Sequence, residues 1–281
     1  MTIRNLSPQQ MFANFAKDHV PEFTFKGKGK EYFQQWKKNA LPKVLNTLGD
    51  IPNKVKANPE LLAEWEYKGL KRQRWIIDVQ KHLSAILLIN LPLDIKKNEK
   101  RPAILCCHGH GEYGKEPIMG NDSNHELKRE CINYNYGEEM ANKGFVTFAI
   151  DWIGFGERND SKKPNHLKTA GARDWCNLYY LHATMLGMTS LSINVAHGMA
   201  AIDVMLSKNY VDKNKIGVMG LSGGGTMSLW MTLCDKRIKA TEIICYSDLW
   251  AAFGIRGINY CGMQVAPGLF QLVNLPELQG L

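Results

Sequence analysis

Residues 215–225 read KIGVMGLSGGG and place one serine, Ser222, among four glycines directly after an apolar run. A serine presented on a sharp turn between a strand and a helix has a strained backbone, and the residues two before and two after it come too close together for side chains. Gly220 and Gly224 occupy those two positions, and the helix-compatible run GTMSLWMTLC (225–234) follows. The stretch therefore predicts a strand, a tight turn and a helix, with Ser222 exposed at the turn as a nucleophile.

Further apolar runs on either side of this stretch alternate with glycine-rich turns and amphipathic segments. They are PAILCC (102–107), FVTFAI (145–150) and ATEIICYS (240–247). Fully apolar strands that alternate with helices are typical of a mainly parallel sheet covered on both faces. Upstream, RQRWIIDVQ (72–80) and LSAILLINLP (83–92) predict an antiparallel hairpin. The fold class is therefore α/β.

The predicted domain organisation has two parts. Residues 1–70 form a helical extension packed on the core, and residues 71–281 form the core itself. The segment 152–189 is too long for an ordinary strand-to-helix connection and is aromatic, so it is a candidate pocket wall, with a surface helix as the alternative. A helix is expected over 191–206, with His197 as a structural residue. The helical extension is expected to contact the core through Phe12, Phe15, Phe33, Trp36, Leu41, Val44 and Leu48.

A serine that attacks a carbonyl also needs backbone N–H groups directed at the oxyanion that forms. Gly223, at the start of the predicted helix, supplies the first. The turn HGHG (108–111), which follows the strand PAILCC, is expected to supply the second through the His110 amide. These two backbone groups are the predicted oxyanion hole.

The same turn contains two patterns that we interpret as coincidental. Gly109-x-Gly111-x-x-Gly114 matches the dinucleotide fingerprint, and residues 109–115 spell most of a P-loop. Both need a helix that begins at the glycines, whereas KEPIMGNDSN (115–124) is rich in turn formers. The histidines 108, 110 and 125 are not at a metal-ligand spacing with acidic or cysteine partners. We therefore predict no cofactor and no metal.

Composition sets the remaining expectations. Lys and Arg exceed Asp and Glu by 35 − 27 = 8, without a basic face interleaved with aromatic residues, so no nucleic-acid partner is expected. The N-terminus has no apolar signal core and no window approaches the length of a membrane span. Seven cysteines, an odd number without C-x-x-C spacing, favour free thiols in a reducing compartment. We expect a cytoplasmic protein that acts on a small molecule and that could be a homo-oligomer.

Three motifs together carry a resemblance to a known family: HGHGEYG (108–114), FAIDWIGFGER (148–158) and GVMGLSGGG (217–225). They resemble the α/β-hydrolase superfamily, in its dienelactone hydrolase and acetyl xylan esterase-like branch, from about residue 70 to the end. The resemblance implies cofactor-free hydrolysis of small or carbohydrate-linked carboxylic esters. It also implies an acyl-enzyme on Ser222, with the amides of His110 and Gly223 as the oxyanion hole.

The chain departs from this family in its expected triad. There the acid and then the histidine follow the serine, whereas here all eight histidines precede Ser222, and 281 − 222 = 59 residues follow it. We therefore expect the chain to be about the first four-fifths of a longer hydrolase, without the last strands, the triad acid and the triad histidine. The strand ATEIICYS would then lie near an open edge of the sheet.

Several alternatives remain open at this point. Asp248, directly after ATEIICYS, is a candidate acid, and its other interpretation is a cap for the segment that follows. His110 is the candidate base from within the chain. A third alternative is a non-catalytic pseudoenzyme or inactive fragment that acts as a binding module. Thioester or peptide hydrolysis would use the same residues as ester hydrolysis.

Overall fold

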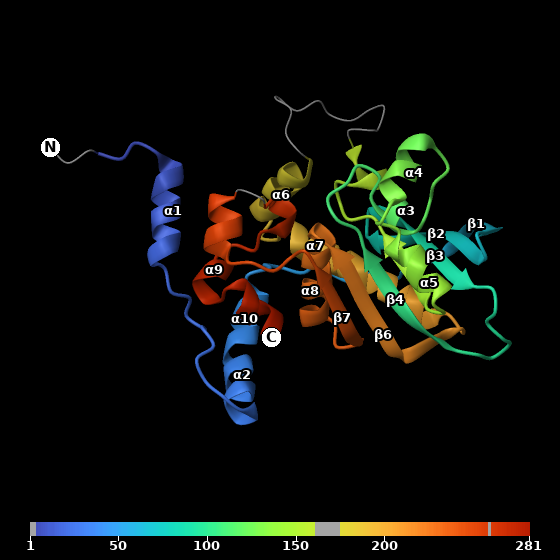
Figure 1. Cartoon of the computed structure of the whole chain (residues 1–281), viewed down its shortest axis with the longest axis horizontal. Coiled ribbons are helices and arrows are strands. Elements are labelled where there is room, and N and C mark those ends of the chain that lie inside the picture. Colours follow the sequence, from blue (N-terminus) through green and yellow to red (C-terminus); the bar gives the residue numbers. More distant parts are fainter. Residues whose placement is uncertain (1–3, 161–174, 258–259) are drawn as a thin grey trace.

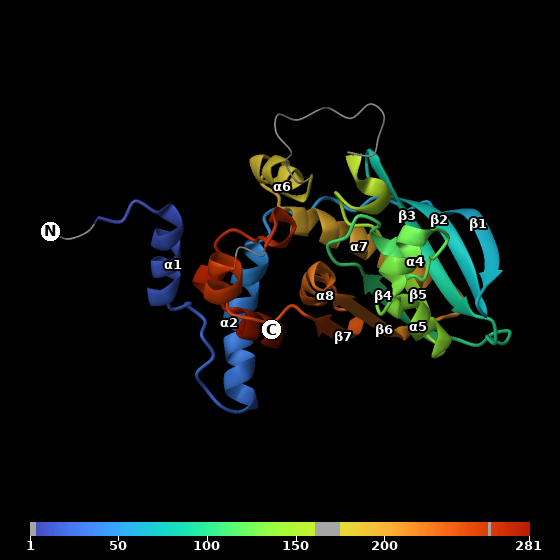
Figure 2. The ribbon, with the colours of Figure 1, turned by 45° about the horizontal axis from the view of Figure 1, so that its top comes forward.

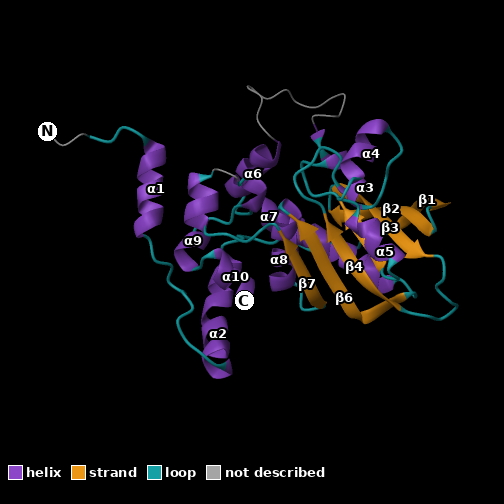
Figure 3. Ribbon diagram, in the orientation of Figure 1, coloured by secondary structure: helices purple, strands orange, loops and turns teal. Residues whose placement is uncertain are grey.

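The structure, a computed structural model, describes residues 4–160, 175–257 and 260–281 (Figure 1). Seven strands form one sheet in the order β1-β2-β3-β5-β4-β6-β7 (Figure 3). The strands are β1 (Glu60–Tyr67), β2 (Leu70–Gln80), β3 (Leu83–Pro92), β4 (Arg101–Cys107), β5 (Val146–Ile150), β6 (Val211–Leu221) and β7 (Ile238–Ile244).

Helices of very different length surround the sheet. The described α-helices are α1 (Pro8–Asp18), α2 (Lys30–Asn46), α3 (Lys115–Ile118), α4 (His125–Cys131), α5 (Tyr136–Asn142), α6 (Trp175–Met185), α7 (Ser190–Ser207), α8 (Gly223–Cys234), α9 (Leu269–Leu272) and α10 (Leu275–Gly280). Three further short helical segments are η1 (Gly156–Arg158), η3 (Trp250–Arg256) and η4 (Gly262–Gln264).

The pairing of the strands confirms the predicted α/β class. β2 and β3 form the expected antiparallel hairpin, and β4 pairs in parallel with both β5 and β6. β7 pairs in parallel with β6 and is the last strand in the sheet order, so the run ATEIICYS does lie at an edge. Consecutive parallel strands with helical connections bring the carboxyl ends of β4, β5 and β6 to the same side of the sheet.

Side chains of β4 alternate between two apolar cores, one on each face of the sheet. Leu105 and Cys107 belong to the larger core, which includes residues of α2, α7 and α8. Ile104 and Cys106 belong to the smaller core, which includes Met119 and is packed against residues of α5. Figure 2 shows the same division, with α4 and α5 on one side of the sheet and α7 and α8 on the other. This period of two is the reason why a strand buried on both faces is apolar throughout.

The N-terminal region follows the prediction only in part. α2 packs on the larger core through Trp36, Val44 and the neighbouring Leu48. The expectation for α1 was wrong, because Phe12 and Phe15 are 54% and 64% exposed. Of the residues in α1 only Ala16 is buried, and the helix lies beside η3 at the periphery of the molecule (Figure 1). An amphipathic pattern shows that a helix has an apolar stripe but not whether another element covers it.

Residues 1–70 also contain a strand that the sequence analysis did not identify. β1 pairs with β2 in an antiparallel arrangement at the far edge of the sheet. Every residue of β1 is exposed, so the strand has no buried face. Its sequence ELLAEWEY does not alternate regularly between apolar and polar residues. The signal that reveals a half-buried strand is therefore missing here.

The candidate pocket-wall segment 152–189 is described at its two ends, as η1 and α6, and residues 161–174 lie outside the described part of the chain. After it, the predicted helix over 191–206 is present as α7. Thr189 caps this helix, because its Oγ1 accepts a hydrogen bond of 3.0 Å from the Ser192 N–H.

Among the residues that the structure describes, no single helix is long and apolar enough to cross a membrane. α6 and α7 pass that test only when taken together, and they are bent by 97° relative to each other.

Candidate active site

Ser222 occupies a strained turn between β6 and α8, as the sequence predicts. Its φ of 59° and ψ of −116° lie in a region that residues other than glycine rarely adopt. The Ser222 N–H donates a 2.8 Å hydrogen bond to the carbonyl of Ile244 at the end of β7, and its own carbonyl accepts one of 3.1 Å from Thr226. The first of these bonds fixes the turn to the edge strand, and the second begins α8.

The glycines around Ser222 make the turn possible. A Cβ atom at Gly220 would overlap the Gly224 carbonyl, and one at Gly224 would overlap the carbonyl of Cys107 at the end of β4. At Gly225 it would lie 2.9 Å from Cβ of Tyr246. The turn therefore closes on itself and is also pressed against the neighbouring strand, which the sequence motif alone does not show.

We call the turn around Ser222, residues 220–225, the elbow. The HGHG turn lies directly against it. A Cβ atom at Gly109 would lie 2.7 Å from the Leu221 carbonyl and 3.5 Å from Cβ of Ser222. The backbone nitrogen of His110 lies 3.6 Å from the Cβ position of Gly223. The two backbone segments predicted to form the oxyanion hole are therefore adjacent, one at the start of α8 and the other after β4.

His108 holds the HGHG turn in place. It is completely buried, its Nδ1 lies 2.8 Å from the Gly109 carbonyl, and its Nε2 accepts a 3.0 Å hydrogen bond from the Trp152 N–H. An acceptor role for Nε2 leaves the proton on Nδ1. Burial lowers the pKa of His108, which favours this neutral form. Because both ring nitrogens are occupied, His108 is a structural residue and has no nitrogen available for a serine.

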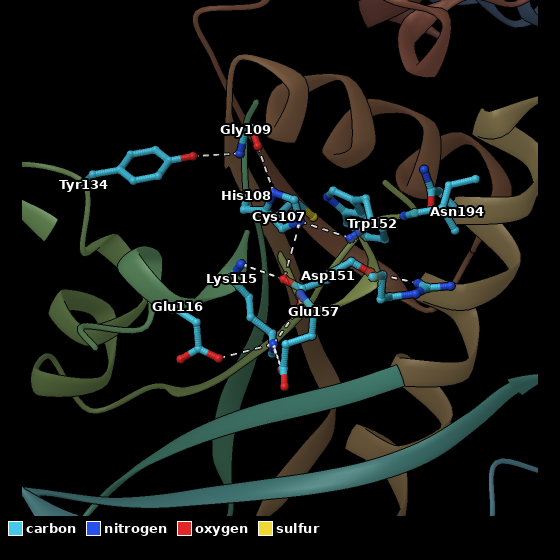
Figure 4. Close-up of polar contacts among 12 residues, drawn as sticks. Cys107, His108, Gly109, Lys115, Glu116, Tyr134, Asp151, Trp152, Glu157 and Asn194 are labelled. Carbon is cyan, nitrogen blue, oxygen red and sulfur yellow. Dashed lines mark hydrogen bonds and ion pairs between the residues drawn. The ribbon is translucent and has the colours of Figure 1, made fainter. Parts of the chain in front are cut away.

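Beneath His108 lies a buried ion pair, which Figure 4 shows at the centre of a polar network. The Lys115 Nζ is 2.8 Å from Oδ2 of Asp151 and 2.6 Å from Oε2 of Glu157. Oδ1 of Asp151 accepts a further bond of 2.8 Å from the Lys115 N–H, and its Oδ2 accepts one of 3.1 Å from the Glu157 N–H. Lys115 is 0% exposed and Asp151 is 1% exposed.

Both members of the pair are charged despite their burial. Burial by itself would lower the pKa of Lys115 and raise that of Asp151. The attraction between them, with help from Glu116 and Glu157 on Lys115, reverses both effects, so the pKa of Lys115 is raised and that of Asp151 is lowered. The pair thus joins the segment after β4 to the segment after β5.

Arg158 extends this network to α7. Its Nη1 donates a 2.8 Å hydrogen bond to the Asp151 carbonyl, and its Nη2 is 3.0 Å from Nδ1 of His197. A guanidinium can only donate, so Nδ1 of His197 is the acceptor and this histidine is neutral. Burial lowers the pKa of His197 well below its usual range, and the charge of Arg158 adds to the effect.

The side chain of His110 is exposed and is directed at two cysteines. Its Nε2 lies 3.9 Å from Sγ of Cys176 on α6, and its Nδ1 lies 3.7 Å from Sγ of Cys261, directly before η4. The ring of Phe155 packs edge-on against it at 4.7 Å. The Cys261 thiol has a lowered pKa, chiefly because it interacts with the Cys176 thiol, and His110 adds to the effect against the opposing influence of burial.

Asp248, the candidate acid, is exposed on the segment that follows β7. Its Oδ1 accepts a 2.7 Å hydrogen bond from the N–H of Leu249, the residue directly after it. This bond reaches only the adjacent residue, and no side chain in the described part of the chain caps η3, whose N-cap position is Leu249.

A cavity of about 570 Å³ lies away from the elbow. Its walls come from β1, β2, β3 and residues 116–123, and they include Trp65, Arg74 and Asn90. Ser222, Gly223 and His110 do not line it. We place the candidate active site at the elbow and not in this cavity. The elbow combines a strained serine with two adjacent backbone amides, whereas the cavity is distinguished only by its volume.

The residues of the buried network are not recognisable from the sequence motifs. Lys115 stands where an incomplete P-loop pattern ends, and α3, the helix that it begins, is just four residues long. The sequence does contain a clue to Asp151, which directly follows an apolar strand and precedes two glycines, Gly154 and Gly156. In the structure both glycines have a positive φ. A Cβ atom at Gly114 or Gly156 would overlap the Asp151 carboxylate, so these glycines let the chain wrap around it.

Comparison with known proteins agrees with this geometry. The model of the Abhydrolase family matches residues 2–250. The chain belongs to this family, within the α/β-hydrolase superfamily. It is 28% identical over 203 residues to "Putative hydrolase YtaP" of Bacillus subtilis (strain 168), a match that covers 70% of this chain and 60% of the relative. The chain therefore spans less than two thirds of the length of this relative.

Solved structures show the same fold at low sequence identity. A "putative acetyl xylan esterase" from Bacteroides fragilis NCTC 9343 superimposes with a TM-score of 0.77 at 18% identity, covering 98% of this chain and 72% of that one. A CE15 glucuronoyl esterase from Teredinibacter turnerae T7901 has a TM-score of 0.56 at 16% identity, covering 94% and 69%. These matches establish the α/β-hydrolase fold of this family member.

The first prediction concerns the contact between the elbow and β4. Gly224→Ala places a Cβ atom on the Cys107 carbonyl, and the backbone cannot relax without moving Ser222. We expect a loss of about 3 kcal/mol or more in the free energy of unfolding, measured by urea denaturation. Gly111→Ala is the matched control, since a Cβ atom there meets nothing within 4 Å. Equal stability of the two variants would contradict the close contact.

The second prediction concerns the buried ion pair. Asp151→Asn leaves the Lys115 ammonium buried with only Glu157 and Glu116 as partners, so we expect a loss of about 3 kcal/mol in the free energy of unfolding. Asp248→Asn, at an exposed position, should change it by no more than about 0.5 kcal/mol. A denaturation curve of Asp151→Asn that overlays the wild type would show that the pair is not needed.

The third prediction concerns pH. The pKa of His197 is lowered in the folded protein from its ordinary value of 6.5, so below pH 6.5 the unfolded chain binds a proton that the folded chain does not. The free energy of unfolding should therefore fall as the pH drops below 6.5, by up to about 1.4 kcal/mol per pH unit from this residue. His197→Asn keeps an acceptor for Arg158 but does not titrate. Urea denaturation between pH 7.5 and 5 should show a shallower slope for this variant, and identical slopes would refute the assignment.

Proposed function

We propose that this protein is a serine-dependent carboxylic-ester hydrolase that works through an acyl-enzyme on Ser222. The observation that carries the proposal is the elbow itself. Ser222 has φ 59° and ψ −116° at the start of α8, and the His110 nitrogen lies 3.6 Å from the Cβ position of Gly223. A strained serine beside two such backbone amides is the arrangement that acyl transfer requires.

In the proposed reaction, Oγ of Ser222 attacks the ester carbonyl carbon and passes its proton to a general base. The resulting oxyanion accepts hydrogen bonds from the N–H groups of His110 and Gly223, and the partial positive charge at the start of α8 adds to their effect. The tetrahedral intermediate collapses, the alcohol leaves with the proton, and the acyl group stays on Oγ. Water then attacks the acyl-enzyme, and the carboxylic acid and the free serine are restored.

The structure limits which histidine could act as the general base. His108 has both ring nitrogens in hydrogen bonds, and Nδ1 of His197 is occupied by Arg158 deep in the core. The nitrogens of His110 are directed at Cys176 and Cys261. We therefore propose that the base is none of these three, and that His110 contributes to the reaction through its backbone amide.

The proposed substrates are small or carbohydrate-linked esters. The fold neighbours include proteins named as a "putative acetyl xylan esterase" and a "CE15 glucuronoyl esterase", which supports this class. Their sequence identity to this chain is below 20%, so the acyl and alcohol groups are to be found by substrate profiling, which also separates ester from thioester and peptide hydrolysis.

A non-catalytic binding role is the alternative. It is favoured by the hydrogen bonds of His108 and His197, because these bonds prevent either histidine from acting as a base for Ser222. A serine without its base retains only the rate that oxyanion stabilisation and binding provide, about 10³–10⁴ over water. The two functions therefore differ in whether Ser222 reacts.

The fourth prediction tests this difference with a fluorophosphonate probe on the protein from the complete reading frame. Ser222 should be labelled, and Ser222→Ala should lose the label and at least about 10³-fold of the rate of p-nitrophenyl acetate hydrolysis. Ser247→Ala, which changes an exposed serine after β7, is the control and should keep both. A folded protein that shows neither labelling nor hydrolysis would support the binding role instead.

Two further variants in the same assay identify the roles of the remaining candidates. His110→Ala keeps the backbone amide, so the rate should fall by less than about 10-fold, whereas loss of a general base would cost far more. Asp248→Asn should also have a small effect, because the hydrogen bond of this side chain reaches only the N–H of Leu249. A drop of about 10⁴-fold would instead make it the triad acid.

A further inference from the structure

The side chains of His110, Cys176 and Cys261 form a cluster that the proposed hydrolysis does not use. They come from three different parts of the chain: the HGHG turn after β4, the start of α6 and the residue before η4. One potential ligand atom from each lies within 4.8 Å of the other two. Two thiols and an imidazole at such short range, with His110 exposed, are a donor set that ordinary core packing does not require.

The spacing of the cluster is close to that of a tetrahedral metal site. Zn²⁺ binds sulfur at about 2.3 Å and imidazole nitrogen at about 2.0–2.1 Å, so tetrahedral angles put sulfur and nitrogen about 3.6 Å apart. The two S···N distances in the structure are 3.7 and 3.9 Å. They join different nitrogens of the ring, and a rotation of the exposed His110 side chain would direct one of them to a shared ion.

The surroundings hold the two cysteines in position. The N–H of Gly262 donates a 2.6 Å hydrogen bond to Oδ1 of Asn177, so the residues next to both cysteines are joined directly. Gln264 donates a 3.0 Å bond from its Nε2 to Oγ1 of Thr226 on α8, one turn after Ser222. The two cysteines are therefore held by hydrogen bonds next to each other and to α8, the helix of the elbow. This reduces the entropy that would be lost when they become ordered around an ion.

We propose that His110, Cys176 and Cys261 bind a divalent transition-metal ion of the zinc type at the rim of the Ser222 site. Thiolate and imidazole donors suit zinc and its analogues, whereas calcium and magnesium prefer oxygen. Three protein ligands leave the fourth position to water. Binding releases the thiol protons to solvent and transfers no electrons.

An ion at this cluster would connect three separate parts of the chain. The bound ion would tie α6 and the segment before η4 to the HGHG turn. The site would thus stabilise the turn that carries the His110 amide, without taking part in ester cleavage.

The fifth prediction uses Co²⁺ as the probe, because its absorption spectrum reports both geometry and thiolate ligands. Titration of the full chain, reduced and kept under argon, should give the visible bands of tetrahedral Co²⁺ together with a thiolate charge-transfer band. Both should saturate at one equivalent, and Zn²⁺ should abolish them. Cys176→Ser and Cys261→Ser should each weaken binding at least about 10-fold and reduce the charge-transfer intensity.

Cys245→Ser is the matched control, since it removes an exposed thiol directly after β7 and should leave the titration unchanged. The proposal fails if the wild type gives no tetrahedral spectrum, or if Cys245→Ser lowers binding as much as the other two. It also fails if Cys176 and Cys261 form a disulfide on exposure to air and the reduced protein takes up no Co²⁺. The spectrum does not depend on esterase activity, so this result is separate from the test of Ser222.

Discussion

The ion pair between Lys115 and Asp151 is the interaction on which the geometry of the site depends. Removing either ion from water costs several kcal/mol, and the pair is stable only because Asp151 accepts from two backbone N–H groups as well as from the ammonium. A buried pair of this kind tolerates little displacement of either partner. The segments after β4 and β5 are thereby held in one relative position.

His108 connects these two segments to the backbone of the HGHG turn through hydrogen bonds. Trp152, the residue after Asp151, donates to Nε2 of His108, and Nδ1 of His108 donates to the Gly109 carbonyl. Gly109 is followed by the His110 amide, and Tyr134 holds Gly109 from the other side with a 2.7 Å bond. The ion pair does not contact Ser222, but through this chain of bonds it fixes the position of the His110 amide, one half of the proposed oxyanion hole.

Much of the fold could be predicted from the sequence, because the relevant signals are local. The glycines at 220 and 224 are required by a turn of five residues, and the parallel strands are apolar because both faces are covered. β1 could not be predicted, since it has no buried face. The exposure of Phe12 and Phe15 depends on which elements happen to cover α1, and that is a property of the assembled fold.

The candidate site was predictable only where one motif contained it. Ser222 and Gly223 are adjacent, and the HGHG turn belongs to a recognisable pattern. Lys115 and Asp151 are 36 positions apart, and Cys261 is 151 positions from His110. No periodicity joins residues at such separations. A lysine in a turn and a cysteine in a loop look ordinary until the topology brings their partners beside them.

The hydrogen bond from the Ser222 N–H to the Ile244 carbonyl has a consequence for how the protein loses function. Ile244 ends β7, which pairs with β6 in the described part of the chain, and the residues of β7 from Lys239 to Glu242 are exposed. When β7 detaches, the elbow loses the bond that keeps it strained, although the remainder of the sheet is intact. The position of the proposed nucleophile therefore depends on a strand pairing that lies outside its own turn and helix.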